Sequence, residues 1–301
     1  MAELHELSQL LITPRDLIRW AASQFEEQGL CYGHGTDNAL DEAASLVLQC
    51  LKLPHDLPAA YFDAVLTPEE RVRVLRWIAQ RRDERLPLPY ITGQAWFAGM
   101  RFIADARALV PRSPIAELIA EGFAPWLGQT PERILDLCTG GGSIAIGCAH
   151  VFPHTPVDAS DLSQDALAQA AENVALHHLQ DQVELLSGDL FAPCAGRQYD
   201  LIVSNPPYVS AGEYAALPPE FAHEPRGALE APEQGLALVL RMLNEAPTYL
   251  KPGGVLICEV GATASALLDA RPQLELSWPE FEHGGDGVFV VTREQLLAAG
   301  V

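Results

Sequence analysis

The sequence is poor in basic residues, in closely spaced cysteines and in long apolar runs, and each shortage excludes a class of protein. Only 19 Lys and Arg stand against 40 Asp and Glu in 301 residues, which gives a formal net charge of −21. A surface of this sign repels the phosphates of nucleic acids and anionic lipids. No apolar run approaches the roughly 20 residues that a membrane-spanning helix needs. We therefore expect neither generic nucleic-acid binding nor association with a membrane.

Signals for secretion, disulfide bonding and metal binding are also missing. The six cysteines are scattered and include no Cys-x-x-Cys pair, which argues for reduced thiols and against a zinc site. The histidines show no metal-ligand spacing. The N-terminal residues contain neither a basic start nor a small-residue cleavage site. We expect a cytoplasmic protein that uses no metal.

What the chain does contain is a helical pattern over its first 90 residues. Thr13-Pro14 offers a helix cap followed by a proline in the first turn, and Thr67-Pro68 does the same with Glu70 placed to complete a capping box. Six arginines follow Pro68 within one predicted helix, and we expect them on a solvated helix face.

The composition then changes twice along the chain. Residues 91–110 are aromatic, branched and interrupted by glycine, which predicts a β-hairpin. Residues 111–301 carry 25 acidic and only 8 basic residues, so they form a distinct, strongly acidic part. We expect a helical domain at 1–90, a β-hairpin linker at 91–110 and a second domain at 111–301.

Strand-like and helix-like segments alternate in the second domain. Strictly alternating β and α segments build a parallel sheet with helices on both faces, and an antiparallel pair is expected to finish it. The sequence therefore predicts a Rossmann-like α/β fold. The predicted strands are 134–137, 157–159, 183–186, 201–204 and 255–260, with the final pair at 274–278 and 288–292.

A glycine-rich turn follows the first of these strands. Its small residues allow a ligand to approach backbone N–H groups closely, but the Gly-x-Gly-x-x-Gly pattern of dinucleotide enzymes is absent. The acid that begins the turn repels a pyrophosphate and suits an ammonium group. The pattern favours S-adenosylmethionine over NAD, and a plain tight turn remains the alternative. The expected cofactor-binding residues are Asp136, Cys138, Thr139, Gly140 and Gly142.

Acids at the ends of the next two strands extend this predicted site. Asp161 lies 19 residues beyond Gly142, a spacing that suits hydrogen bonds to ribose hydroxyls, and Asp158 is the alternative. Asp189 is placed to accept from an adenine amino group, with Leu190 covering the ring.

The most specific motif is Asn205-Pro206-Pro207-Tyr208 at the end of the fourth predicted strand. The prolines hold the backbone rigidly. The Asn205 side chain and the Pro206 carbonyl can accept the two hydrogens of a planar –NH2 group while the Tyr208 ring stacks on its plane, with the hydroxyl idle. The nitrogen lone pair then faces an electrophilic methyl group. We therefore predict that these four residues are catalytic.

Together the two motifs resemble those of the protein-(glutamine-N5) methyltransferases, from about Cys31 to the C-terminus. The resemblance implies a seven-stranded class I S-adenosylmethionine-dependent methyltransferase domain after a helical substrate-recruiting domain and a β-hairpin linker. It implies S-adenosyl-L-methionine as methyl donor, with S-adenosyl-L-homocysteine as product. It also implies that the donor site is lined by Asp136, Gly140, Gly142, Asp161, Asp189 and Asn205. The glutamine amide would be held by Asn205, Pro206 and Tyr208.

Four further segments resemble one branch of this family, which methylates a glutamine of the large-subunit ribosomal protein L-three, a basic substrate. The sister branch, which modifies peptide release factors, typically has Pro-Arg-Pro-x-Thr-Glu where this chain has the residues from Pro111 to Glu117, and this departure argues against release factors. The four segments are Tyr32–Asn38, Val110–Ile115, His223–Pro225 and Gly284–Phe289.

Two other functions remain as alternatives. A nucleic-acid amino-methyltransferase acting on adenine or guanine uses the same Asn-Pro-Pro-Tyr chemistry, but the acidic second domain is a poor surface for nucleic acid. A non-catalytic S-adenosylmethionine-binding module would not require Asn205–Tyr208.

Overall fold

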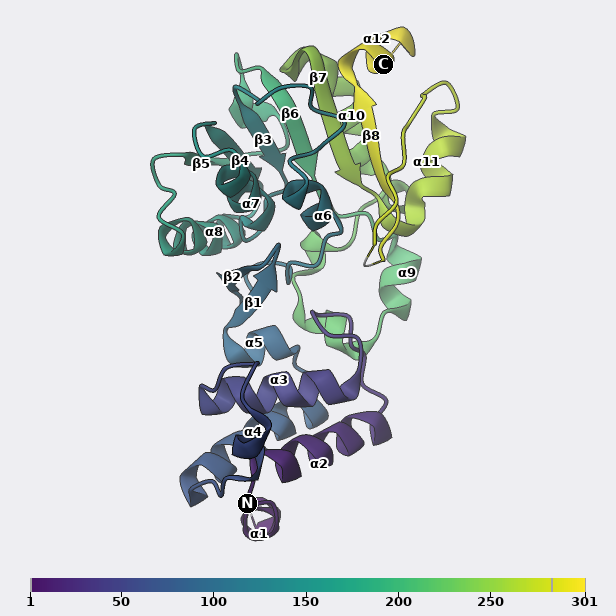
Figure 1. Ribbon diagram of the computed structural model, residues 1–301. Coiled ribbons are helices and arrows are strands. Elements are labelled where there is room, and N and C mark those ends of the chain that lie inside the picture. Colours follow the sequence, from purple (N-terminus) through teal and green to yellow (C-terminus); the bar gives the residue numbers. More distant parts are fainter. Residues whose placement is uncertain (1, 283, 301) are drawn as a thin grey trace. The chain divides into compact units, whose positions relative to one another are not determined.

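The computed structural model describes residues 2–282 and 284–300, which divide into two compact units (Figure 1). Unit 1 contains the described residues up to Ala95 together with Pro218–His223, and unit 2 contains Trp96–Leu217 and the described residues from Glu224 onward. The sequence carries no signal that a segment near residue 220 belongs with the N-terminal helices. The division of the chain at residues 90 and 110 stays a prediction.

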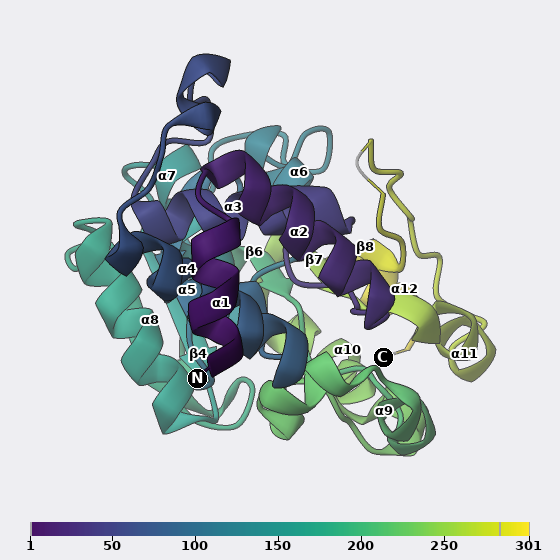
Figure 2. The same ribbon diagram turned by 90° about the horizontal axis from the view of Figure 1, so that it is seen from below.

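Unit 1 is helical, and its long helices pack side by side (Figures 1 and 2). Helix α2 packs on α3, and α4 contacts α1, α2 and α3. Buried aliphatic and aromatic side chains from α2, α3 and α4 form one core. The elements are α1 (Ala2–Leu10), α2 (Pro14–Glu27), α3 (Ala39–Leu51), η1 (Ala59–Asp63), α4 (Pro68–Asp83), α5 (Leu88–Thr92) and η3 (Pro219–His223).

The helix starts in unit 1 follow from local sequence, as predicted. Thr13 accepts a hydrogen bond from the backbone N–H of Asp16, whose carboxylate in turn accepts from the Thr13 N–H. Thr67 and Glu70 form the same reciprocal pair at the start of α4. Each box satisfies N–H groups that have no partner within the helix, which explains why both helices begin at these positions.

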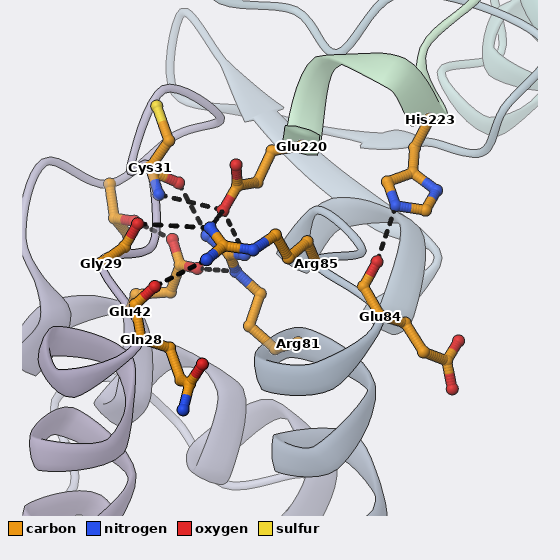
Figure 3. Close-up of polar contacts among 10 residues, drawn as sticks. Gln28, Gly29, Cys31, Glu42, Arg81, Glu84, Arg85, Glu220 and His223 are labelled. Carbon is orange, nitrogen blue, oxygen red and sulfur yellow. Dashed lines mark hydrogen bonds and ion pairs between the residues drawn. The ribbon is translucent and has the colours of Figure 1, made fainter. Parts of the chain in front are cut away.

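One of the six arginines that follow Pro68 departs from the expected solvated face. Arg81 is fully buried and forms ion pairs with Glu42 and Glu220, while its Nη2 donates to the Cys31 carbonyl at 2.7 Å (Figure 3). Glu220 is also completely buried and accepts from the Cys31 N–H at 3.0 Å. The prediction was wrong for Arg81 because two acids distant in sequence compensate its charge.

Unit 2 contains a six-stranded sheet in the order β5-β4-β3-β6-β7-β8 (Figure 1). The first five strands of this order run parallel and β8 pairs antiparallel with β7. This arrangement confirms the Rossmann-like α/β prediction. A separate two-stranded sheet joins β1 (Gln94–Phe97) to β2 (Met100–Ile103). The large sheet comprises β3 (Ile134–Leu137), β4 (Val157–Asp161), β5 (Val183–Ser187), β6 (Tyr199–Ser204), β7 (Leu250–Glu259) and β8 (Val288–Thr292).

The expected strand at 274–278 is reduced to a single bridge. Ser277 pairs with Val290 of β8 through two backbone hydrogen bonds, of 2.8 and 3.0 Å. Pro279 follows two residues later and has no N–H with which to extend a ladder. Within the described residues the sheet therefore has six strands, where the sequence predicted seven.

Helices cover both faces of the sheet. Strand residues alternate between two cores, with Leu201 and Val203 packing on one side and Ile202 on the other. Helices α6, α7 and α8 contribute to the first core, and α10, α11 and α12 to the second. In the described part of either unit, no helix is long and apolar enough to cross a bilayer. The α-helices of unit 2 are α6 (Ile115–Ala120), α7 (Ser143–Val151), α8 (Gln164–Leu176), α9 (Ala211–Ala216), α10 (Ala237–Tyr249), α11 (Ala264–Ala270) and α12 (Arg293–Ala298).

Candidate active site

A cavity of about 430 Å³ opens in unit 2 at the carboxyl ends of the parallel strands. Its floor is formed by the residues that end or directly follow β3, β4, β5 and β6. In open α/β sheets this edge is where ligands bind, because loops from adjacent strands diverge there. Its other walls are the segment Arg107–Ser113 and the residues Pro225, Gly227 and Ala228.

The structure brings most of the predicted site residues together around this cavity. Four of them do not line it: Asp136 and Pro206 are buried, Gly142 caps the start of α7, and Tyr208 packs against Gly261. The predicted residues that do line it are Cys138, Thr139, Gly140, Asp161, Asp189, Leu190, Asn205 and Pro207.

Asp136 lies beneath the glycine turn and organises it. Its Oδ2 accepts from the Thr139 hydroxyl at 2.6 Å and from the Ala145 N–H at 3.0 Å. Among the described residues, Oδ1 has no hydrogen-bond partner although it is buried. Burial raises the pKa of this carboxyl to about 7, against the hydrogen bonds that favour the anion. A buried carboxylate oxygen without a hydrogen-bond partner is suited to a cationic ligand group. Asp136 can attract such a group by direct contact or by its charge beneath the glycine turn.

This buried acid predicts a pH-dependent stability. In the unfolded chain Asp136 has its ordinary pKa of 3.8, whereas burial in the folded chain raises this pKa to about 7. Stability should therefore fall as pH rises through this interval, by at most about 1.4 kcal/mol per pH unit from this group. Asp136→Asn should gain little stability over the unmodified protein near pH 4 and most above pH 7. Chemical denaturation at four pH values checks this; a gain that does not vary with pH would contradict it.

Of the two acids proposed for ribose, Asp161 has the appropriate position. Asp161 ends β4 and lines the cavity, and its oxygens accept from the N–H groups of Gly140 and Ser163, both at 2.8 Å. Burial raises the pKa of Asp161. Asp158 lies near the start of the same strand, fully buried, and is paired with Arg133 and Arg197. The geometry favours Asp161 as the ribose ligand.

We expect Asp161→Ala to weaken methyl-donor binding by about 1.5–3 kcal/mol, because a charge-assisted hydrogen bond is lost. Asp158→Asn is the matched control: it should lower stability through its arginine partners and leave donor affinity unchanged. Titration calorimetry measures both. Equal donor affinity in Asp161→Ala and the unmodified protein would exclude Asp161 as a ligand.

The proposed adenine-binding acid has a partner that sequence reasoning missed. Asp189 lines the cavity after β5, and its two oxygens accept from the two Nη atoms of Arg241 on α10, at 2.9 and 3.1 Å. Such a fork fixes the carboxylate in one plane. Leu190 is buried beside it and also lines the cavity. Asp189 is thus oriented before any ligand binds.

The Asn205–Tyr208 tetrad follows β6 as predicted, but its tyrosine is engaged differently from the expectation. The Tyr208 hydroxyl, expected to be idle, donates to Glu259 at 2.7 Å. Asn205 and Pro207 line the cavity. Within the described residues, no hydrogen bond occupies the side-chain amide of Asn205. Asn205 therefore brings a side-chain amide to the cavity lining directly after β6.

Cys138 also lines the cavity but is chemically quiet. Burial, with the nearby Asp161 and Asp136 carboxylates, raises the pKa of its thiol well above the ordinary value. The thiolate is the nucleophilic form of cysteine. Cys138 therefore serves as a small wall residue.

The fold and the site together define a methyltransferase domain. Residues 118–267 match the family described as "Methyltransferase small domain". The fold is similar to that of the hMettl16 catalytic domain, solved in complex with MAT2A 3′UTR hairpin 6, at 18% identity and a TM-score of 0.50, covering 74% of this chain and 80% of that one.

Sequence relatives narrow this class to one family. A protein of Xanthomonas campestris pv. campestris named ribosomal protein uL3 glutamine methyltransferase is 55% identical over 284 residues, which cover 94% of this chain and 92% of the relative. A protein of Xylella fastidiosa with the same name is 52% identical, covering 94% and 91%. The chain belongs to the ribosomal protein uL3 glutamine methyltransferase family.

Proposed function

We propose that this protein transfers a methyl group from S-adenosylmethionine to the side-chain amide nitrogen of a glutamine in ribosomal protein uL3. The observation that carries this proposal is the identity of 52–55% over 94% of the chain with relatives of that name. The cavity with Asn205 in its wall supports it, because an amide acceptor at that point suits a planar –NH2 group.

The residues around the cavity fit the proposed methyl donor. The volume of about 430 Å³ is within the range of small-molecule sites. Asp161 would accept from the ribose, Asp189 and Leu190 would meet the adenine, and the turn above Asp136 would receive the charged amino-acid end. S-adenosylmethionine supplies an electrophilic methyl group. Across the described residues, no group of three or more His, Cys, Asp or Glu side chains could hold a metal.

The tetrad would act by positioning and electrostatics. Asn205 Oδ1 and the Pro206 carbonyl would each accept one N–H of the glutamine amide, which fixes its plane and turns the nitrogen lone pair towards the methyl group. The new N–CH3 bond would form as the S–CH3 bond of the donor breaks. As this nitrogen gains positive character, both N–H groups become stronger donors and the two acceptors bind more tightly. One of the two protons would then leave to water, which restores a neutral amide. Pro207 would keep the backbone rigid, and the Tyr208 ring would stack on the plane of the amide.

The charge of unit 2 supports a basic protein as substrate. Its sequence is strongly acidic, and ribosomal proteins are strongly basic, so long-range attraction would speed their encounter. The same charge disfavours nucleic acid as substrate. We propose that the reaction takes place in the cytoplasm, where ribosomal proteins are made.

The decisive experiment labels an extract of cells that lack this enzyme. Purified protein and tritiated S-adenosylmethionine are added, and the labelled species is digested and sequenced by mass spectrometry. Label on a glutamine of uL3 supports the proposal. Label on a peptide release factor or in RNA would overturn the substrate assignment, and no label in any fraction would overturn the activity.

A further inference from the structure

A buried acid lies behind the tetrad and takes no direct part in the chemistry proposed above. Glu259 ends β7, is only 6% exposed, and does not line the cavity. A buried carboxylate is costly unless hydrogen bonds satisfy it. Its partners therefore indicate why it is there.

Both oxygens of Glu259 accept from hydroxyl groups. Tyr208 donates to Oε1 at 2.7 Å, and Ser113 donates to Oε2 at 2.5 Å. Ser113 Oγ also accepts from the N–H of Ile115 at the start of α6, at 3.2 Å. Two hydroxyl donors on two oxygens of one side chain suit a carboxylate, which has acceptor capacity only. Glu259 thus joins the tetrad to the chain segment that begins α6.

The backbone and one ring edge of Tyr208 are also closely packed. A Cβ atom at Gly261 would lie 2.7 Å from the Tyr208 ring, and one at Gly235 would lie 1.9 Å from the Tyr208 carbonyl oxygen. Both glycines have positive φ, of 46° and 86°, which other residues rarely adopt. The next residue, Val209, is held by hydrogen bonds with Leu229 and Ala231, both of 2.9 Å.

The segment that holds Glu259 is also a wall of the cavity. Arg112 and Ser113 both line it. Arg112 donates to both oxygens of the fully buried Glu224, at 2.6 and 3.2 Å. Two adjacent residues of one wall are therefore fixed on two buried carboxylates, one of which also receives the Tyr208 hydroxyl.

We propose that Glu259 is a positioning residue for methyl transfer, which acts by holding the Tyr208 hydroxyl and is itself held by Ser113. The inference rests on the proposed function of the tetrad. A hydrogen bond at the far end of the tyrosine fixes the ring, and the ring fixes the backbone that carries Asn205. A small displacement of Asn205 from its position at the reacting amide is enough to reduce turnover severely.

The test compares an apolar and a conservative replacement. Glu259→Leu fills the site with an apolar side chain and removes both acceptors, whereas Glu259→Gln retains an amide oxygen for Tyr208 and can donate to Ser113. Glu121→Gln, on an exposed acid of the same unit, is the matched control. For each variant, kcat and KM for uL3 and the affinity for S-adenosylmethionine are measured well below the unfolding temperature.

We expect Glu259→Leu to lower kcat about tenfold or more with KM and donor affinity little changed, and Glu259→Gln to stay within about threefold of the unmodified kcat. Tyr208→Phe should cause a loss similar to that of Glu259→Leu. The double variant should be no slower than either single one, since both remove the same hydrogen bond. Losses that multiply in the double variant, or an unchanged kcat in Glu259→Leu, would overturn the proposal.

Two further measurements distinguish a failure of the Glu259 proposal from a loss of folding and from a failure of the proposed function. If Glu259→Leu does not fold, a double-mutant cycle of Ser113→Ala and Tyr208→Phe replaces it. Because Ser113 is proposed to act on Tyr208 through Glu259, the double variant should have the kcat of Tyr208→Phe alone. If the unmodified protein does not methylate uL3, the proposed function fails. If it does, and Glu259→Leu matches it, only the role of Glu259 is wrong.

Discussion

Asn205→Ala should lower kcat by ~100-fold or more while changing the affinity for uL3 much less, on the scale of losing one preorganised electrostatic contact. Asn205 lines the cavity directly after β6, where its side-chain oxygen would meet the proposed amide –NH2 group. The hydrogen bond strengthens as the nitrogen gains charge, so its loss raises the barrier more than it weakens binding. Steady-state and single-turnover methylation of uL3 measure the two effects separately.

The control for this prediction is Asn244→Ala, an exposed asparagine on α10 in the same unit. It should have the unmodified kcat. If Asn205→Ala instead raises KM and leaves kcat unchanged, Asn205 contributes only to binding, and the electrostatic part of the mechanism is wrong.

The largest effect on stability is expected at Arg81. Arg81→Met should lower the free energy of unfolding by about 3–5 kcal/mol, because it leaves the buried Glu42 without its cation and leaves the buried Glu220 with Arg85 alone, at 3.2 Å (Figure 3). Burial alone would raise the pKa of Glu220, but the Cys31 N–H and Arg81 hold it below its usual value. This preference for the anion makes the loss of the cation costly at neutral pH. Urea denaturation at pH 7 measures the change.

Arg76→Met on the same helix is the matched control, because Arg76 is exposed, and it should change stability by less than about 0.5 kcal/mol. Adding Glu42→Gln to Arg81→Met should recover part of the loss by removing one unpaired charge. A loss below about 1 kcal/mol in Arg81→Met, or no recovery in the double variant, would show that the cluster is not compensated as described.

Features that depend on neighbouring residues could be predicted from the sequence. The caps predicted at Thr13 and Thr67 are both present, because the groups that form them are three residues apart. The glycine turn and the tetrad were placed at strand ends for the same reason: an apolar run is followed at once by residues that cannot continue it. The strand at 274–278 had a weaker pattern, and it pairs only at Ser277.

The choice between Asp161 and Asp158 as the proposed ribose ligand depends on where strand β4 ends. The sequence ended the second strand of the sheet at residue 159, whereas β4 continues to Asp161. Asp161 therefore lies at the carboxyl edge with the cavity, and Asp158 lies near the opposite edge, close to Arg133. Strand ends are set by the partners of the backbone across the sheet, which a single segment does not reveal.

The sequence by itself determined the order of the strands in the second domain and the positions of the glycine turn and the tetrad, whose chemistry stays a prediction. Only the tertiary structure showed that Glu259 holds Tyr208 from 51 residues away, and that Glu220 pairs with Arg81 across 139 residues. A charged side chain in a helix is typical of a solvated face, and nothing local distinguishes Arg81 from Arg76. A charged group is stable in the interior only where hydrogen-bond acceptors and opposite charges surround it. Folding brings these partners of Arg81 together from distant segments, so its burial could not be predicted from the neighbouring residues.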